Sequence, residues 1–289
     1  MSGELAGTQN WSELYKEKGA CPDTFSVFSS IILDYYLKQG RQFSWRQQIS
    51  PYRVLVSEIM LQQTQTIRVE SKFDAFILQF PGFNELASAT FGEVLALWKG
   101  LGYNRRAKYL HDIARLVVSD FGTRMPDEPK ILIDFPGIGK ATAASICVFA
   151  YNRAFPFIET NIRTVFIHFF FSEKTNVTDA QIMKLVESTI HKSEPRQWFY
   201  GLMDYGVMLK KQVGNLNRLS RHYTKQSRFA GSDRQLRGRI LQLLLDTDRL
   251  APASLPELLN EPAERISILV DALKGERLIM EKDGVLFLE

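Results

Sequence analysis

Hydrophobic residues recur at helical spacing along nearly the whole chain, and this periodicity restricts the fold more than any other feature. In residues 25–37, for example, Phe25, Phe28 and Ile32 fall on one side of a helix that ends near Gly40. The segments between periodic stretches are short and carry proline or glycine, as at Pro81 and Pro126. The pattern predicts an all-α chain in which each helix packs against its neighbours.

The last part of the chain has a different pattern. After the helices, two short apolar strands at 277–281 and 285–288 flank the turn signal Asp283-Gly284, which predicts a β-hairpin. Ser254 is expected to open the middle helix of this part through a capping box. Three helices followed by a hairpin indicate a winged-helix-like module whose third helix is not basic, so we expect it to pack or to contact protein. The expected helices cover residues 25–37, 51–70, 69–80, 84–89, 91–99, 105–121, 130–135, 140–151, 161–170, 179–193, 195–214, 233–245, a segment opened at 254, and 263–273.

Composition excludes several functional classes. The 289 residues include two cysteines, Cys21 and Cys147, far apart in sequence, and four histidines without ligand spacing. Metal catalysis is therefore not expected. No apolar run reaches the roughly 18–20 residues of a membrane span, and the N-terminal segment lacks a secretory pattern. We expect a cytoplasmic protein, associated with the nucleoid if it binds DNA.

Positive charge is concentrated in one stretch of the chain. Between Lys210 and Arg249 basic residues far outnumber acidic ones, whereas the residues after Arg249 are net acidic. Lys210, Lys211 and Arg221 are the candidates to neutralise a phosphate backbone, because each neutralised phosphate releases counterions. A solvated linker is the alternative interpretation of the same charges.

The segment Phe135–Ala141 predicts a tight reversal between two helices. Glycines at 137 and 139 permit left-handed backbone and a close approach of a ligand. The helix that restarts at Lys140 presents free N–H groups and a positive dipole end to an anion. Pro136, Gly137, Ile138, Gly139 and Lys140 are therefore candidate DNA-phosphate ligands, with Ile138 turned inward. A purely structural turn is the alternative.

Several motifs stand in an order found in one protein family. They are Trp45-Arg46, Ser57-Glu-Ile-Met-Leu-Gln-Gln-Thr64, Gly100-Leu-Gly-Tyr103, the hairpin above, and Phe157-Ile-Glu-Thr-Asn-Ile162. Together they resemble the helix-hairpin-helix DNA glycosylases, most closely the MutY-type adenine glycosylases, over roughly residues 25–215. The resemblance implies a two-lobed all-α glycosylase fold, with the winged-helix-like α plus β-hairpin module at its end.

The resemblance implies that Glu58 is the catalytic acid and that Glu159 and Asn161 complete the catalytic group. Excision of a base cleaves an N-glycosidic bond through a cationic sugar, so a proton on the base and a negative group beside the sugar both help. Burial among apolar neighbours would raise the pKa of Glu58, as an acid near neutral pH requires. The family has Asp where this chain has Glu159, so one extra methylene must fold back or reach a shifted sugar. A surface position for Glu58 is the alternative.

The remaining motif positions imply a base pocket and a DNA surface. Trp45, Arg46, Ala141 and Asp204 match the pocket, although an Arg46–Asp204 structural pair is an alternative. The resemblance places Gln63 and Thr64 where the base leaves the duplex, and Leu101 and Tyr103 in a loop that contacts the opposite strand. Core positions for Leu101 and Tyr103 are the alternative to insertion into DNA.

Three departures from the family refine the prediction. Ala141 stands where bifunctional relatives have a Schiff-base lysine, so no lyase activity is expected. Residues 210–229 contain no cysteine, so we expect no iron–sulfur cluster and no other cofactor; a monovalent cation at the hairpin is left open. The 8-oxoguanine-recognition domain of the family has no counterpart. The expected domains are 1–50 with 150–215, 51–149, a basic linker at 216–232, and the module at 233–289.

The combined prediction is a monomeric, monofunctional DNA glycosylase of base-excision repair. Its expected partner is duplex DNA with a lesion or mismatch, and an adenine-like purine is the favoured target. A thymine/uracil mismatch glycosylase and a non-catalytic lesion binder remain as alternatives. An abasic-site lyase and a protein-binding helical scaffold are disfavoured, by Ala141 and by the combined motifs respectively.

Overall fold

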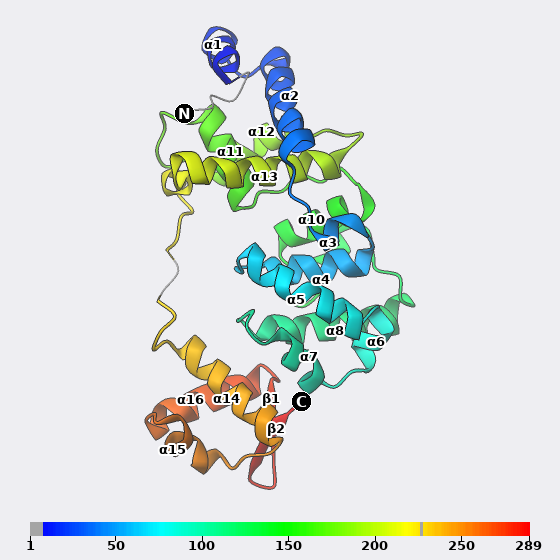
Figure 1. Cartoon of the computed structure of the whole chain (residues 1–289), viewed down its shortest axis with the longest axis vertical. Coiled ribbons are helices and arrows are strands. Elements are labelled where there is room, and N and C mark those ends of the chain that lie inside the picture. Colours follow the sequence, from blue (N-terminus) through cyan, green and yellow to red (C-terminus); the bar gives the residue numbers. More distant parts are fainter. Residues whose placement is uncertain (1–7, 226–227) are drawn as a thin grey trace. The chain divides into compact units, whose positions relative to one another are not determined.

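The computed structural model describes residues 8–225 and 228–289, which are mostly helical (Figure 1). Within these ranges the chain forms 16 α-helices, two short 3-10 helices and one two-stranded sheet. The predicted all-α fold with a terminal β-hairpin is confirmed. No helix in the described ranges is long and apolar enough to cross a membrane.

The chain divides into two compact units, each built from three separate stretches of the sequence. Unit 1 comprises residues 1–49, 127–133 and 138–225, and unit 2 comprises residues 50–126, 134–137 and 226–289. These boundaries differ from the expected ones. Residues 127–133 of the expected domain 51–149 and residues 216–225 of the expected linker group with unit 1. Residues 138–149 group with unit 1 because the helix they form packs there, and the C-terminal residues group with unit 2 instead of forming a unit of their own.

Unit 1 is organised around two helices that lie side by side, α11 and α13 (Figure 1). Aromatic side chains fill its core: Phe28 contacts the rings of Phe166 and Trp198 edge to face, and all three are buried. The helices of unit 1 are α1 (Thr8–Lys18), α2 (Pro22–Gln39), α3 (Ser44–Gln47), α9 (Pro129–Leu132), α10 (Lys140–Tyr151), α11 (Thr160–Phe170), α12 (Asp179–Thr189), α13 (Pro195–Val213) and η1 (Leu216–Leu219).

Unit 2 begins with a helix bundle in which α4 packs on α5 and α8. Leu55 and Ile59 of α4 are fully buried, as the apolar spacing of this helix requires. Phe73 and Trp98 are also fully buried in this unit. The bundle consists of α4 (Pro51–Leu61), α5 (Thr66–Gln79), α6 (Phe83–Ser88), α7 (Phe91–Trp98) and α8 (Arg105–Phe121).

Three expected helices are clearly shorter than the sequence pattern predicts: those at 130–135 and 179–193 end at Leu132 and Thr189, and the one at 51–70 is interrupted. A helix over 51–70 is wrong, because α4 ends at Leu61 and α5 begins at Thr66. Gln63, between them, has a left-handed backbone with φ of 54°, which no α-helix continues through. The break places Gln63 and Thr64 in a loop instead of on a helix face.

The C-terminal module, residues 233–289, has the predicted order of elements. The two strands lie side by side (Figure 1). They pair antiparallel, with Ile279 opposite Leu288 and Lys282 opposite Val285. The capping box expected at Ser254 is wrong: its hydroxyl donates to the carbonyl of Ala251 and does not cap the helix. The elements are α14 (Asp233–Thr247), η2 (Pro252–Ser254), α15 (Leu255–Leu259), α16 (Ala263–Gly275), β1 (Ile279–Lys282) and β2 (Val285–Leu288).

Candidate active site

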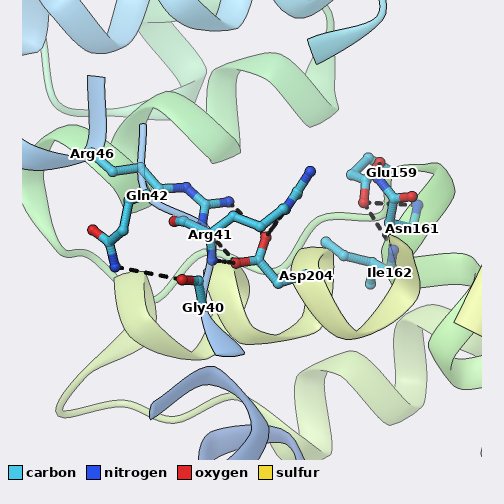
Figure 2. Close-up of polar contacts among 8 residues, drawn as sticks. All are labelled: Gly40, Arg41, Gln42, Arg46, Glu159, Asn161, Ile162 and Asp204. Atoms are coloured by element: carbon cyan, nitrogen blue, oxygen red, sulfur yellow. Dashed lines mark hydrogen bonds and ion pairs between the residues drawn. The ribbon is translucent and has the colours of Figure 1, made fainter. Parts of the chain in front are cut away.

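The carboxylate of Glu159 caps the first turn of α11. Its Oε1 accepts the backbone N–H groups of Asn161 at 2.8 Å and Ile162 at 2.9 Å, and its Oε2 accepts Nδ2 of Asn161 at 3.1 Å (Figure 2). The Glu159 side chain therefore folds back onto the end of the helix, and this accommodates its extra methylene group. Glu159 and Asn161, predicted as partners, are brought together.

The surroundings of Glu159 oppose its ionisation on balance. Burial raises the pKa of this carboxyl above its ordinary value, although the two backbone N–H bonds and the guanidiniums of Arg163 and Arg41 act in the other direction. A carboxylate held at a helix N-terminus is well placed to interact with positive charge, because its hydrogen-bond partners fix its position.

The start of α11 lies against α13 at a glycine. A Cβ atom at Gly206 would lie 2.3 Å from the carbonyl oxygen of Asn161, so only glycine permits this approach. Asn217, after α13, donates from Nδ2 to the carbonyl of Thr160 and to Oγ1 of Thr164. These contacts fix the turn of α11 that Glu159 caps.

Asp204 of α13 forms a buried ion-pair cluster with two arginines (Figure 2). Its Oδ2 and Oδ1 accept Nη1 and Nη2 of Arg46 at 2.8 and 3.0 Å. It also accepts the backbone N–H of Arg41 at 2.8 Å and its Nε at 2.7 Å. The bonds to Arg46 form the structural Arg46–Asp204 pair that the sequence offered as an alternative. Asp204 is buried, with 1% of its surface exposed.

Aromatic rings enclose the guanidinium of Arg46. It lies over the Tyr200 ring at 4.1 Å and over Phe43 at 5.1 Å, and Phe43 stacks on Trp45 at 4.6 Å. The Nε of Arg46 is buried and has no hydrogen-bond partner among the described residues. Arg46 is thus held by ion pairing and stacking, while one of its donors remains unused.

Glu58 lies on α4, close to its C-terminal end. Its neighbours Ser57 and Ile59 are buried, while Glu58 itself is partly exposed. The position is neither the dry core nor the open surface, so a side chain here can reach solvent or substrate. Glu58 belongs to unit 2, and Glu159 belongs to unit 1.

Arg106 of α8 connects the two loops expected to contact DNA. Its guanidinium is buried and donates to the carbonyls of Met60 and Gln62 at the end of α4, and to Oγ1 of Thr64. It donates as well to the carbonyls of Leu101 and Gly102. Burial lowers the pKa of Arg106 to about 10, which leaves it charged at neutral pH. One arginine therefore satisfies carbonyls that both loops would otherwise bury unpaired.

The expectation that Leu101 projects from a loop tip is wrong for this conformation. Leu101 is 3% exposed, and its carbonyl is bound by Arg106. The flanking glycines at 100 and 102 have φ of 95° and 73°, so they turn the loop inward. Gln63 is exposed and Tyr103 is partly exposed, so these two side chains are accessible in their loops.

The predicted hairpin reverses the chain between α9 and α10. Gly137 has φ of 70°, and a Cβ atom there would lie 2.2 Å from the Tyr109 ring. Ile138 is buried and Pro136 partly so, whereas Gly139, Lys140 and Ala141 are exposed at the start of α10. Nε2 of Gln62 donates to the carbonyl of Gly137 at 3.2 Å. The open helix end has the geometry that binds an anion.

The basic candidates Lys210, Lys211 and Arg221 are all exposed, at the end of α13 and after η1. Sequence reasoning missed Arg41, Tyr200 and Arg106. Arg41 and Arg46 are five residues apart beside the recognised Trp45-Arg46 pair, which was the available signal for Arg41. No sequence signal marks Arg106 as buried, because arginines on an amphipathic helix are ordinarily exposed.

Known proteins match this chain over most of its length. A family model for the HhH-GPD superfamily of base excision DNA repair proteins matches residues 56–192. An adenine DNA glycosylase of Mycolicibacterium smegmatis is 32% identical over 265 residues, which cover 84% of this chain and 90% of that protein. A thymine/uracil-DNA glycosylase of Methanothermobacter thermautotrophicus is 29% identical and covers 70% of this chain and 95% of that protein.

The fold agrees with these matches. The solved structure of a thermostable thymine-DNA glycosylase superimposes with a TM-score of 0.59 at 27% identity, covering 68% of this chain and 94% of that one. The sequence match, the shared fold and the carboxylate-capped α11 agree with one another. This chain therefore belongs to the HhH-GPD superfamily of base excision DNA repair proteins and is a DNA glycosylase.

Proposed function

We propose that this chain is a monofunctional glycosylase that removes adenine from mispairs in duplex DNA. The observation that carries the proposal is the Glu159 carboxylate, held by the N–H groups of Asn161 and Ile162 at the start of α11. A fixed negative group of this kind suits a reaction that passes through a cationic sugar. The relatives named adenine DNA glycosylase support adenine as the base removed.

In this reaction Glu58 protonates a ring nitrogen of the adenine. The bond between that base and the sugar C1′ then breaks, its electron pair leaves with the base, and a positive charge develops on the sugar. Glu159 stabilises this charge, and Asn161 holds the carboxylate in place. Water adds to C1′ and loses a proton, so the products are free adenine and an abasic site.

The base pocket is formed by Trp45, Arg46, Asp204 and Ala141 in this proposal. Because Arg46 and Asp204 bind each other, they contribute a rigid wall to the pocket. Ala141 is exposed at the start of α10 and offers only a methyl group. It supplies no amine, so the proposed enzyme releases the base without forming a Schiff base.

DNA contact is assigned to three sets of residues. They are Gln63, Thr64 and Tyr103 in the two loops that Arg106 joins, residues 136–140 of the hairpin, and Lys210, Lys211 and Arg221. The enzyme acts as a monomer in the cytoplasm or nucleoid and requires no cofactor; a monovalent cation at the hairpin is compatible with the open start of α10.

The experiment is a panel of duplex oligonucleotides incubated with the full chain. Adenine is placed opposite guanine, 8-oxoguanine or thymine, and thymine or uracil is placed opposite guanine; release of free base is measured. We expect release of adenine from at least one mispair. Release of no base from any duplex would contradict enzymatic function and leave the non-catalytic lesion binder.

A second candidate is a thymine/uracil mismatch glycosylase. A relative with that name is covered over 95% of its length, and the thymine-DNA glycosylase structure superimposes over most of this chain. Release of thymine or uracil opposite guanine, with adenine left intact in every pair, would establish this candidate in place of the first.

A further inference from the structure

The C-terminal module is attached to α8 by ion pairs along one side of that helix. Arg105 lies 3.6 Å from Oε1 of Glu276, and Arg237 of α14 binds the other oxygen of Glu276. Lys108, three residues after Arg105 on α8, lies 3.2 Å from the carboxylate of Glu289. Lys108 itself is only 4% exposed. A Cβ atom on Gly92 would touch Leu288 at 3.6 Å. Apolar and charged contacts together thus hold the module against the bundle of unit 2.

The module also reaches the loop at residues 99–104, the Tyr103 loop. Arg234, in the first turn of α14, donates from Nη1 to the hydroxyl of Tyr103, and its guanidinium carbon lies 5.3 Å from the centre of the Tyr103 ring. The guanidinium of Arg106 lies 5.5 Å from the centre of the same ring. Tyr103 therefore contacts one arginine of the bundle and one of the C-terminal module.

The backbone of Tyr103 is in a conformation that needs such support. Its φ is 48°, in the left-handed region that an aromatic side chain rarely adopts. The preceding Gly102 is also left-handed, and its carbonyl accepts from Arg106 and from Nε1 of Trp98. A strained residue persists where its surroundings hold it, and here Arg234 provides the contact at the tip of the side chain.

We infer that the C-terminal module is part of the DNA-reading surface, with Arg234 as a positioning residue that holds Tyr103 in place for contact with the duplex. The inference rests on the proposed DNA contact of the Tyr103 loop. It gives the module a function that its third helix, which is not basic, does not suggest: the module acts through the protein loop and does not enter a groove itself. Arg234 contributes to lesion discrimination because Tyr103 must be ordered before DNA arrives.

The test compares binding of two duplexes to the full chain. One duplex carries a tetrahydrofuran abasic-site analogue opposite guanine, and the other is the same duplex undamaged. The Kd ratio, which is the Kd for the undamaged duplex divided by the Kd for the abasic-site duplex, measures how well the protein discriminates the lesion. The variants are Arg234→Ala, Arg234→Lys, Tyr103→Phe and the double variant Arg234→Ala/Tyr103→Phe. The matched control is Lys282→Ala, which removes one positive charge from an exposed side chain of the same module.

We expect Arg234→Ala and Tyr103→Phe each to reduce the Kd ratio by about five-fold, and the double variant to lose no more than either single one, because both remove the same contact. Arg234→Lys keeps the positive charge but loses the planar guanidinium. Compared with Arg234→Ala, we expect it to restore the affinity for undamaged DNA but not the Kd ratio. Lys282→Ala leaves the ratio unchanged. Thermal unfolding of each variant measures whether the module stays folded.

Additive losses in the double variant, or equal losses on both duplexes after Arg234→Ala, would overturn the inference, since either result assigns Arg234 to general phosphate attraction. A normal Kd ratio in Tyr103→Phe would do the same. The proposed function is tested by a different experiment. It is contradicted if the wild-type chain releases no base from any mispair, even when the Kd ratios still differ among these variants.

Discussion

Asp204 binds Arg46 through both carboxylate oxygens, at 2.8 and 3.0 Å, across 158 residues of sequence. Arg41 also binds both oxygens of this carboxylate, so one buried negative charge is shared by two guanidiniums. The cluster fixes the short helix α3 to α13 and with it the position of Trp45. The expected pocket wall is therefore built on a buried charge network and does not consist of free side chains.

Replacement of that charge has a clear expected cost. Asp204→Asn leaves two arginines without their counter-charge, and we expect it to lower the free energy of unfolding by about 3–5 kcal/mol, as the loss of one member of a buried pair does. Urea unfolding measures this. The control is Asp34→Asn, whose exposed pair with Lys38 should contribute less than about 1 kcal/mol. Equal effects of the two substitutions would show that the Asp204 cluster contributes little.

The proposed role of Glu58 as proton donor is tested by Glu58→Gln. This variant keeps the size of the side chain and removes the acid, so we expect base release in single-turnover assays to fall by about 10²–10⁴-fold while binding to a mispaired duplex is retained. Glu70→Gln, an exposed position on α5, serves as the control and should keep the full rate. A Glu58→Gln enzyme as fast as the wild type would remove Glu58 from the mechanism.

Glu159 predicts a pH dependence of stability. Its pKa is higher in the folded chain than in the unfolded chain, because burial outweighs the N–H groups of Asn161 and Ile162 and the charges of Arg163 and Arg41. The folded state thus binds the proton more tightly, and its stability declines as pH rises from the ordinary pKa of glutamate through the raised one. We expect this decline in urea unfolding of the wild type between those two pKa values and its absence in Glu159→Gln.

The same raised pKa affects activity in the opposite direction. If the carboxylate form stabilises the sugar cation, the rate of base release should increase as pH rises through the raised pKa of Glu159. Single-turnover rates across a pH series measure this. An acid limb at the ordinary pKa of an exposed glutamate would contradict the assignment.

Most of the helices follow from apolar spacing, and the bounds of α8 and α10 agree with the predicted residues 105–121 and 140–151. The sequence patterns missed α1, α3, η1 and η2, and two of these elements are fixed by tertiary contacts. The four-residue helix α3 is fixed by Arg46–Asp204, and η1 is fixed by Asn217. The break after Leu61 was missed because residues 62–65 continue a helix-compatible pattern, while Arg106, 44 residues later, binds the carbonyl of Gln62.

The candidate site was predictable to the extent that motifs mark it. The motif positions predicted that Asn161 holds the Glu159 carboxylate, and the two residues are hydrogen-bonded in the structure; their catalytic role stays a prediction. The inward turn of Leu101 was not predictable, because two flanking glycines allow either direction and a buried arginine from α8 decides between them.

Absence of lyase activity is tested by borohydride trapping. The wild type has Ala141 at the exposed first turn of α10, so we expect no covalent adduct with DNA that contains an abasic site. Ala141→Lys places an amine at that position, and we expect it to form a trapped adduct visible by denaturing gel. A trapped adduct with the wild-type chain would show that another amine acts as nucleophile.

The basic residues after α13 are tested by salt dependence. Simultaneous replacement of Lys210, Lys211 and Arg221 by Ala should weaken binding to undamaged and mispaired duplexes alike. It should reduce the slope of log Kd against log salt by about 2–3, one for each lost phosphate contact. Fluorescence anisotropy at several salt concentrations measures the slope. An unchanged slope would indicate a solvated surface with no role in binding.

The close approach of Gly206 to the carbonyl of Asn161 makes position 206 more important than its place within a helix suggests. The residue lies within α13, yet any side chain there would collide with the carbonyl of Asn161 and displace the helix end on which Glu159 rests. In a survey of natural variants, a change at position 206 would be classed among interior packing mutations. Its effect would nevertheless fall on the proposed catalytic carboxylate, because the added Cβ atom would displace the turn of α11 that Glu159 caps.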